Sequence, residues 1–368
     1  MAKAAKAKKS IITDQAYSFF RNYINNASPV GFETWGQKLW IDYLKPYVDT
    51  HFVDPYGTAV GVINPEHPFK VVIEAHADEI SWFVNYITAD GLIYLKRNGG
   101  VDHQTAPASR VLIHGKKGAV KAVFGWPAIH TRLNPDTKET SPRTDNLWLD
   151  CGARNKKEVE ALGIHIGAVV TYQDGYDELA NGNLVGRAFD NRVGGFMIAE
   201  VARLLKENKK KLPFGLYVVN AVQEEIGLRG AEMIARRIKP NIAIVTDVTH
   251  DTTTPMINKN IEGDVSTGKG PSLAYAPAVH NKLLAHVEQI ASAKKIPVQW
   301  RALSRSTGTD TDSFAYSNDG CPSVLISIPL RYMHTTVEML HKDDIENTIK
   351  LMYETLLSLT PKTNLSYL

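Results

Sequence analysis

Apolar strands and amphipathic helices alternate along most of this 368-residue chain. Val71-Val72-Ile73 is a short, fully apolar run, which is typical of a strand in a sheet covered on both faces. Further strands are expected at 215–222, 242–246 and 323–328, and helices at 13–26, 32–43, 193–209, 229–237, 281–294 and 343–359. This alternation predicts an α/β fold with a mostly parallel sheet and helices on both faces.

The pattern changes between about residues 79 and 184. Short apolar runs at 92–95, 110–113 and 167–170 are separated by frequent glycine and proline, and long helical patterns are scarce. This texture is typical of a small β-barrel or sandwich. The chain is therefore predicted to contain an α/β domain, residues 10–78 and 185–368, interrupted by an inserted β domain, residues 79–184.

The first nine residues are predicted to be a disordered tail, because four lysines occur there and no apolar core follows them. Those lysines exceed the formal net charge of +3, so the rest of the chain has no basic excess for nucleic acid. No apolar run approaches membrane-spanning length, and the two cysteines, Cys151 and Cys321, make no disulfide framework. We therefore expect a cytoplasmic protein without nucleic-acid or membrane partners.

Histidines and carboxylates lie where the predicted strands end, and ligands of open α/β sheets bind beyond the carboxyl ends of the strands. His76 follows 71–73, Glu224 and Glu225 follow 215–222, Asp247 follows 242–246, His334 follows 323–328, and Asp190 precedes the 193–209 helix. Two histidines and several carboxylates suit zinc, cobalt or manganese. Five protein ligands exceed the needs of one tetrahedral zinc, whereas two metals that share a bridging carboxylate would use them all.

The neighbouring glutamates Glu224 and Glu225 repel each other, and burial at a strand end adds to the cost. A solvated turn is the simplest explanation of such a pair. The metal hypothesis offers another, in which one glutamate binds a cation, the other faces the open position, and the cations offset the repulsion. The free glutamate can then take a proton from water.

Six segments resemble, in order and spacing, the motifs of the TET-forming dinuclear metallo-aminopeptidases, the relatives of glutamyl and deblocking aminopeptidases. They are EAHADEISWFV, GRAFDNRVGG, QEEIGLRGA, TDVTHDTTTP, GTDTDSF and ISIPLRYMHTTVE. The resemblance covers nearly the whole chain. It implies an α/β domain of the zinc-peptidase type, an inserted β-barrel for oligomer contacts, short peptide substrates, and a homo-oligomer, a dodecamer built from dimers.

Carried over residue by residue, the resemblance also implies a role for each candidate. His76 and Asp247 bind the first metal, Glu225 and His334 bind the second, Asp190 bridges the two, Glu224 is the general base, and Asp78 orients the His76 imidazole. The implied cofactors are two divalent ions per subunit, zinc first, with cobalt or manganese as alternatives.

Some positions have no settled role. Asn191 stands where the family often has aspartate, and Thr335-Thr336 stands where it usually has Ser-Pro. Arg331 is more simply a loop brace than a substrate clamp, and Asp310 either lies near the site or caps a turn. His130 lies within the inserted segment, and the residues that bind substrate are unknown.

The function expected from these residues is a metal-dependent aminopeptidase that releases N-terminal residues from short peptides. One alternative is a glycosidase of the endoglucanase type, although glycosidase carboxyls flank a bond at about 5–9 Å from opposed positions. A related metal-dependent deacylase or carboxypeptidase is another alternative. A non-catalytic assembly protein is disfavoured because Glu224 is present.

Overall fold

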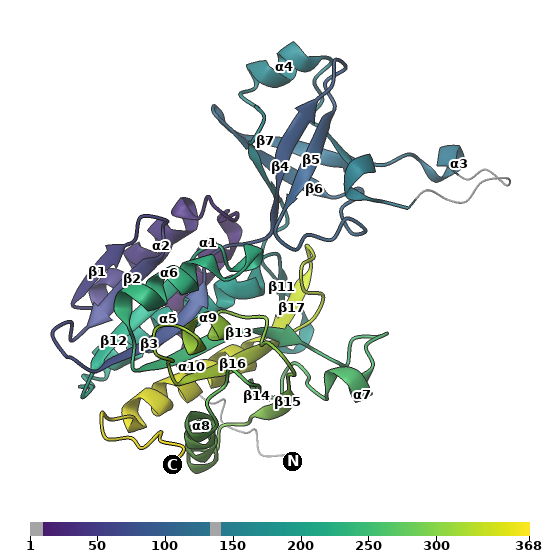
Figure 1. The fold of residues 1–368 in the computed structure, drawn as a ribbon. Helices are drawn as coiled ribbons and strands as arrows, with labels where there is room; N and C mark the ends of the chain where they lie inside the picture. Colours follow the sequence, from purple (N-terminus) through teal and green to yellow (C-terminus); the bar gives the residue numbers. More distant parts are fainter. Residues whose placement is uncertain (1–9, 133–140) are drawn as a thin grey trace, which may run out of the picture.

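A computed structural model describes residues 10–132 and 141–368, so the predicted tail, residues 1–9, lies outside the described residues. Figure 1 shows a larger body built around a long sheet and a smaller barrel that projects from it. The predicted architecture, an α/β sheet fold with an inserted small β-barrel, is confirmed.

Eight strands form the central sheet. In spatial order they are β1 (Thr50–Val53), β2 (Ala59–Ile63), β12 (Gly215–Ala221), β3 (Lys70–His76), β13 (Ile242–His250), β16 (Ser323–Leu330), β14 (Ser272–Tyr275) and β15 (Gln299–Ala302). The four middle strands β12, β3, β13 and β16 are parallel, and β2 and β14 join them through antiparallel pairs. The carboxyl ends of the four middle strands therefore lie along one edge of the sheet.

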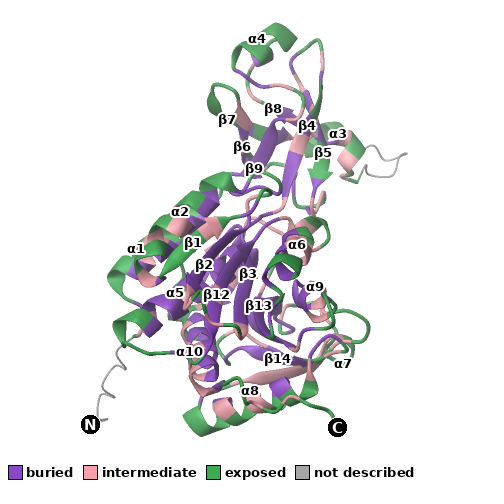
Figure 2. Cartoon of the chain, turned by 60° about the vertical axis from the view of Figure 1, so that its left-hand side comes forward, coloured by how far each residue is buried: buried purple, intermediate pink, exposed green. Residues whose placement is uncertain are grey.

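Helices cover both faces of this sheet (Figure 2). One group comprises α1 (Asp14–Asn25), α2 (Thr34–Leu44), α5 (Phe189–Glu207), α8 (Asn281–Lys294) and α10 (Lys342–Ser358), and the other comprises α6 (Arg229–Ile238) and α9 (Thr311–Ala315). Helix α5 packs against strands β3 and β13 and also against helices α1, α2 and α10, so it is buried over nearly its whole length. It therefore holds its N-terminal residues in a fixed position at the sheet edge.

Helix α2 shows how the two bodies meet. Trp40 is completely buried, and its indole N–H donates to the Gly195 carbonyl of α5 at 2.7 Å. Trp35 lies on the same helix but is 42% exposed, and its ring lies 4.9 Å from that of His114 on the barrel. The barrel therefore supplies the aromatic neighbour of Trp35, whereas Trp40 packs into the core of the α/β body.

The projecting barrel is a closed ring of antiparallel strands. In order around the ring they are β4 (Ser81–Ile87), β5 (Ile93–Asn98), β8 (Trp148–Asp150), β7 (Gly118–Gly125), β6 (Arg110–Gly115) and β9 (Val169–Tyr172). The barrel has its own apolar core around Trp82 and Phe124, whose ring centroids are 5.4 Å apart. The boundaries 79–184 of the inserted domain remain a prediction.

A small sheet links the segment after the barrel to the strand that precedes the last helix, α10. Its strands are β10 (Asp177–Glu178), β11 (Asn183–Gly186) and β17 (Glu338–His341). Gly186 pairs with Glu338 in this sheet. Glu338 is thereby brought beside the start of α5.

The remaining elements are short. They are α3 (Ile129–Arg132), α4 (Lys156–Ala161), α7 (Lys259–Glu262), and the 3-10 turns η1 (Lys45–Tyr47), η2 (Thr144–Asn146), η3 (Ala180–Gly182) and η4 (Glu224–Ile226). Within the described ranges, no helix has both the length and the apolar character needed to cross a membrane.

We predict that Trp40→Ala lowers the free energy of unfolding by about 3–5 kcal/mol, because it removes a fully buried aromatic side chain. Trp35→Ala is the matched control on the same helix and should cost only about 0.5–1.5 kcal/mol, the worth of one aromatic contact. Urea denaturation followed by circular dichroism measures both. Equal losses for the two variants would contradict this account of the core.

Candidate metal centre

The candidate ligands lie at the edge where the parallel strands end. His76 is the last residue of β3, and the turn η4, which contains Glu224 and Glu225, is separated from the end of β12 by two residues. His334 lies just beyond β16. Asp247 was expected after its strand, but β13 continues to His250 because its pairing with β16 extends that far, so Asp247 lies within β13.

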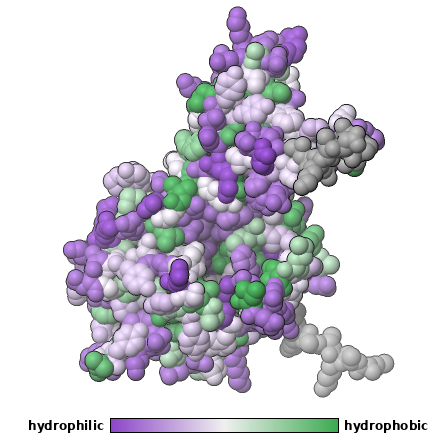
Figure 3. All heavy atoms as spheres, turned by 45° about the vertical axis from the view of Figure 1, so that its right-hand side comes forward, coloured by the Kyte–Doolittle hydropathy of each residue, from purple (hydrophilic) through white to green (hydrophobic). Residues whose placement is uncertain are grey.

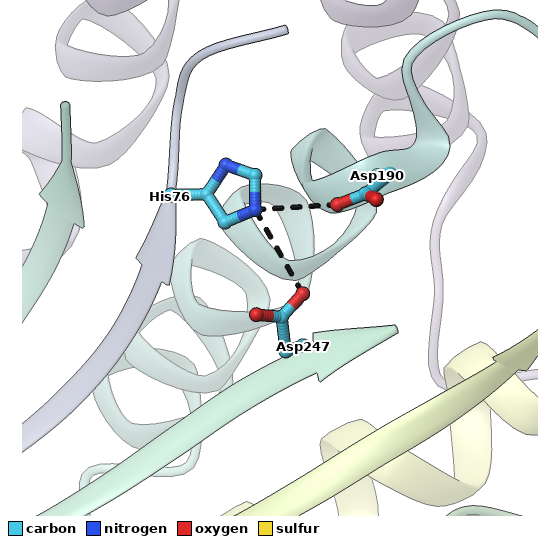
Figure 4. A group of neighbouring side chains, drawn as sticks. All are labelled: His76, Asp190 and Asp247. Carbon is cyan, nitrogen blue, oxygen red and sulfur yellow. Dashed lines mark ion pairs between the residues drawn. The ribbon is translucent and has the colours of Figure 1, made fainter. Parts of the chain in front are cut away.

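Asp190, at the start of α5, lies between the two histidines. Its Oδ1 is 3.2 Å from His76 Nε2, and its Oδ2 is 3.2 Å from His334 Nε2. Figure 4 shows the first half of this arrangement, in which His76, Asp190 and Asp247 reach one another from β3, α5 and β13. One carboxylate therefore presents one oxygen to each imidazole.

Two groups of possible metal ligands share Asp190. His76, Asp190 and Asp247 form one group, and Asp190, Glu225 and His334 form the other, with the ligand atoms of each group within 4.8 Å of one another. In the first group His76 Nε2 is 3.8 Å from Asp247 Oδ1, and in the second His334 Nε2 is 3.2 Å from Glu225 Oε1. The structure thus brings together all five residues named as ligands from the sequence.

The two imidazoles differ in how their other nitrogen is placed. His334 Nδ1 lies 2.9 Å from the Gly100 carbonyl oxygen, as is typical of metal-binding histidines. His76 Nδ1 lies 3.5 Å from Asp78 Oδ1 and has no hydrogen-bond partner among the described residues. In each ring Nε2 faces the carboxylates.

Asp78 is fully buried and also fixes the turn that bears the two glutamates. Its Oδ1 accepts from the Glu224 backbone N–H at 3.0 Å, and its Oδ2 accepts from that of Glu225 at 3.1 Å. One carboxylate therefore contacts both the histidine of one group and the backbone of the glutamate in the other.

Glu338 is a supporting residue that the sequence reasoning missed. Its carboxylate accepts from the backbone N–H of Asp190 at 3.0 Å and from that of His334 at 2.9 Å. Its position four residues after His334 in the motif ISIPLRYMHTTVE was the available signal. Asn191, the departure noted beside Asp190, is accommodated because its side-chain amide donates to the Thr246 carbonyl at 2.8 Å.

Burial shifts the pKa values of the carboxyls and of the imidazoles in the cluster in opposite directions. Burial raises the pKa of Glu224 to about 11, against the lowering effect of His76. It also raises the pKa of Glu225 and of Asp247. Burial lowers the pKa of His334, but hydrogen bonds to Asp190 and Glu225 outweigh it and raise that pKa to about 12.

These shifts describe a cluster that is short of positive charge, because buried carboxylates are costly unless cations or protons compensate them. Nitrogen and oxygen donors that converge in two groups around one shared carboxylate suit divalent cations of the zinc type. The residues present therefore fit two such ions.

The residues without settled roles lie outside the ligand groups. Arg331 donates to Asp251 Oδ2 at 2.9 Å and Thr253 Oγ1 at 2.7 Å, which is the geometry of a loop brace. Asp310 makes no capping bond; it is buried beside Glu74, and burial raises the pKa of both carboxyls, that of Glu74 to about 8. His130 is exposed on α3 of the barrel. Thr335 Oγ1 donates to the Tyr332 carbonyl at 2.6 Å.

The ligand groups open into a cavity of about 570 Å³. Other residues of its wall include Leu228, Arg301, Thr307, Asp312 and Met333. Leu228, Asp312 and Met333 lie within the motifs QEEIGLRGA, GTDTDSF and ISIPLRYMHTTVE, whereas Arg301 and Thr307 lie outside all six motifs and nothing in their local sequence distinguishes them.

Comparisons with known proteins agree with the geometry. The family model of the M42 glutamyl aminopeptidases matches residues 57–351. The lysyl aminopeptidase of Pyrococcus furiosus is 30% identical over 94% of this chain and 98% of its own length.

Solved structures give the same result. A TET aminopeptidase from a marine sediment archaeon of the Thaumarchaeota superposes with a TM-score of 0.90 at 29% identity, covering 95% of this chain and 98% of its own. An aminopeptidase from Desulfurococcus kamchatkensis gives 0.87 at 30% identity, covering 94% and 96%. The resemblance drawn from the motifs is confirmed, and the chain belongs to the M42 glutamyl aminopeptidase family.

Proposed function

We propose that this chain is a metal-dependent aminopeptidase that releases N-terminal residues from short peptides and binds two divalent cations. Membership of the M42 family makes it a peptide hydrolase. The observation that carries the rest is the position of Asp190, with one carboxylate oxygen 3.2 Å from each of two histidines. A carboxylate in that position suits a pair of cations better than a single one.

His76, Asp190 and Asp247 would hold the first cation, and Asp190, Glu225 and His334 the second. Zinc suits these ligands best, and cobalt or manganese are alternatives. Cations at such a site supply Lewis-acid polarisation of a peptide carbonyl and lower the pKa of water.

Glu224 is the proposed general base. Its Oε2 lies 3.8 Å from His76 Nε2, and its side chain lines the cavity without belonging to either ligand group. Its pKa, raised by burial, should fall when nearby cations favour the charged form. The Glu224 carboxylate would take a proton from the attacking water and later deliver it to the leaving amine.

Asp78 is proposed to orient the general base and the neighbouring ligands relative to one another. It contacts the His76 ring and accepts from the backbone N–H groups of Glu224 and Glu225. Since it holds one residue of each ligand group and the base together, its role is orientation.

The alternative activities differ in what they require. A glycosidase needs two carboxyls opposed across a sugar. Here Glu225 Oε1 lies 3.2 Å from His334 Nε2, and Glu224 Oε2 lies 3.8 Å from His76 Nε2, so each lies against a histidine. A deacylase or carboxypeptidase would not need a free N-terminal amine, and this difference can be measured.

Self-association through the barrel is also part of the proposal, with a dodecamer built from dimers as the expected particle. On the face of the molecule drawn in Figure 3, hydrophobic residues occur on both the barrel and the α/β body. On the barrel, Tyr86 of β4 is 57% exposed, and Ile166, in the turn before β9, is 59% exposed. Exposed apolar side chains that gather in a patch are typical of a protein interface.

A cytoplasmic location is inferred from the cysteines. Cys151 and Cys321 are both free. Free thiols are common where glutathione keeps the compartment reduced. We expect no nucleic-acid partner, because the charge of the chain is nearly balanced.

Hydrolysis of aminoacyl anilides should disappear on exhaustive chelation and return with zinc, cobalt or manganese, because the proposed cations polarise the carbonyl. The same aminoacyl anilide with an acetylated N-terminus is the matched control, and the enzyme should not hydrolyse it. Full activity in protein shown to be metal-free by elemental analysis would contradict the proposal. Preference for the acetylated peptide would favour a deacylase.

Glu224→Gln and Glu225→Gln should fail differently. Glu224→Gln cannot accept a proton, so it should keep both metals and lose about 10²–10⁴-fold in rate. Glu225→Gln should lose the second metal first, because a neutral amide is a poor ligand, and added metal should restore part of its activity. Metal content by mass spectrometry, measured beside turnover, distinguishes them.

Glu232→Gln, at a half-buried position on α6 away from the cavity, is the control and should change neither quantity. Loss of metal from Glu224→Gln with retention in Glu225→Gln would reverse the two assignments.

Replacing Tyr86 and Ile166 together by aspartate should convert the assembly into a smaller species, because two buried charges disfavour an apolar contact. Multi-angle light scattering measures the mass of each particle. Tyr275→Asp, at a position 52% exposed on β14, is the control outside the barrel. A monomeric wild-type protein, or an unchanged mass for the double variant, would refute the role of the barrel.

A further inference from the structure

The connection between barrel strands β5 and β6 begins at Gly99 and reaches the candidate metal centre. Its first two residues, Gly99 and Gly100, lie against Glu225 and His334, which belong to the second ligand group. The Gly100 carbonyl oxygen is 2.9 Å from His334 Nδ1. A backbone group of the barrel therefore contacts a candidate ligand that the α/β body supplies.

This contact determines which nitrogen of His334 is free. A carbonyl oxygen can only accept a hydrogen bond, so the proton between the two atoms belongs to Nδ1. Nε2 of the neutral ring then keeps its lone pair and faces Asp190 and Glu225, each with an oxygen at 3.2 Å. The Gly100 carbonyl thus both orients the ring and selects the tautomer that can bind a cation.

The ring of His334 also explains why position 100 is a glycine. Gly99 has a φ of +90°, a conformation that favours glycine, but Gly100 does not have a positive φ, so its backbone is open to other residues. A Cβ at position 100 would lie 2.6 Å from His334 Cε1 and 2.7 Å from Nδ1, which is closer than van der Waals contact allows. The imidazole therefore excludes a side chain there.

The residues on either side hold this segment in place. Asn98, the last residue of β5, is buried, and its amide donates to the Val30 carbonyl at 2.9 Å and to Ser81 Oγ at 2.8 Å. Val101 is buried in the apolar core of the barrel. The Gly100 carbonyl is therefore fixed by the α/β body on one side and by the barrel core on the other.

We propose that this segment of the barrel completes the second cation site, with Gly100 as the positioning residue for His334. The inference rests on the proposed two-cation aminopeptidase and adds to it a residue outside both ligand groups. Gly100 acts only through the ring that it orients. A side chain at position 100 should therefore weaken the second cation and leave the first in place.

The first test measures the zinc affinity of each site by equilibrium dialysis and elemental analysis. Gly100→Ala should lower the affinity for one ion about 10- to 100-fold, the usual effect of disturbing a group that orients a metal-binding histidine. The other affinity should stay near the wild-type value. In His334→Ala, which keeps the first ligand group, the added Gly100→Ala change should not alter the affinity of the remaining ion, and this result assigns the effect to the second site.

Gly115→Ala is the matched control within the barrel. Gly115 ends β6 and does not have a positive φ, and a Cβ there would lie 2.6 Å from the Gly163 carbonyl oxygen. The clash is as close as that at position 100 but involves no candidate ligand. Gly115→Ala should lower the melting temperature without changing the affinity for either ion.

The second test uses metal-free protein. Gly100→Ala should lower the melting temperature of the wild type, because the added methyl group displaces the His334 ring. In the His334→Ala background the ring is absent, so the same substitution should cost nothing or raise the melting temperature slightly, since alanine restricts the unfolded chain. A merely structural role of Gly100 would give the same loss in both backgrounds.

Several results would overturn the inference. They are wild-type affinity for both ions in Gly100→Ala, an equal weakening of both ions, the same weakening in Gly115→Ala, or an equal loss of melting temperature in the two backgrounds. A wild-type protein that binds a single ion would overturn it together with the second site. A failure of the aminopeptidase activity alone would look different, because no anilide would be cleaved while the affinities and melting temperatures still differed as described.

Discussion

The crowding of buried carboxylates at one edge of the sheet is the constraint on which the rest of this structure depends. Asp190, Glu224, Glu225 and Asp247 converge there within a few ångströms of two imidazoles. Without compensation, their mutual repulsion and desolvation would oppose folding of the sheet edge. Two divalent cations would compensate these four negative charges, so the carboxylates that oppose folding on their own would also form the proposed site.

Regular secondary structure fixes the positions of these side chains. The parallel strands β3 and β12 place His76 and the turn η4 at one edge of the sheet, and the buried helix α5 places Asp190 between the two histidines. Asp78 and Glu338 then bind backbone N–H groups of the residues that surround the cluster. Secondary contacts of this kind orient side chains that bind metals, so Asp78 and Glu338 would support the proposed ligands.

Much of this site was predictable because the strand-end rule acts locally. Residues that follow an apolar strand can be placed at the sheet edge without knowing the strand order, and this reasoning named the five candidate ligands that the structure brings together. It missed strands β1, β2, β14 and β15 of the central sheet. The short, mixed sequences of β1 and β15 carry no apolar period, and β2 and β14 are only five and four residues long. It also missed Arg301, since a lone arginine on an edge strand resembles a solvated residue until the cavity beside it is known.

The most direct test of this account is the zinc stoichiometry of the wild type and Asp190→Asn after equilibrium dialysis, read by elemental analysis. The account predicts two ions per wild-type chain. It also predicts that Asp190→Asn weakens both sites together, because one carboxylate serves both ligand groups. Two ions retained in Asp190→Asn at wild-type affinity, or a single ion in the wild type, would contradict the shared centre.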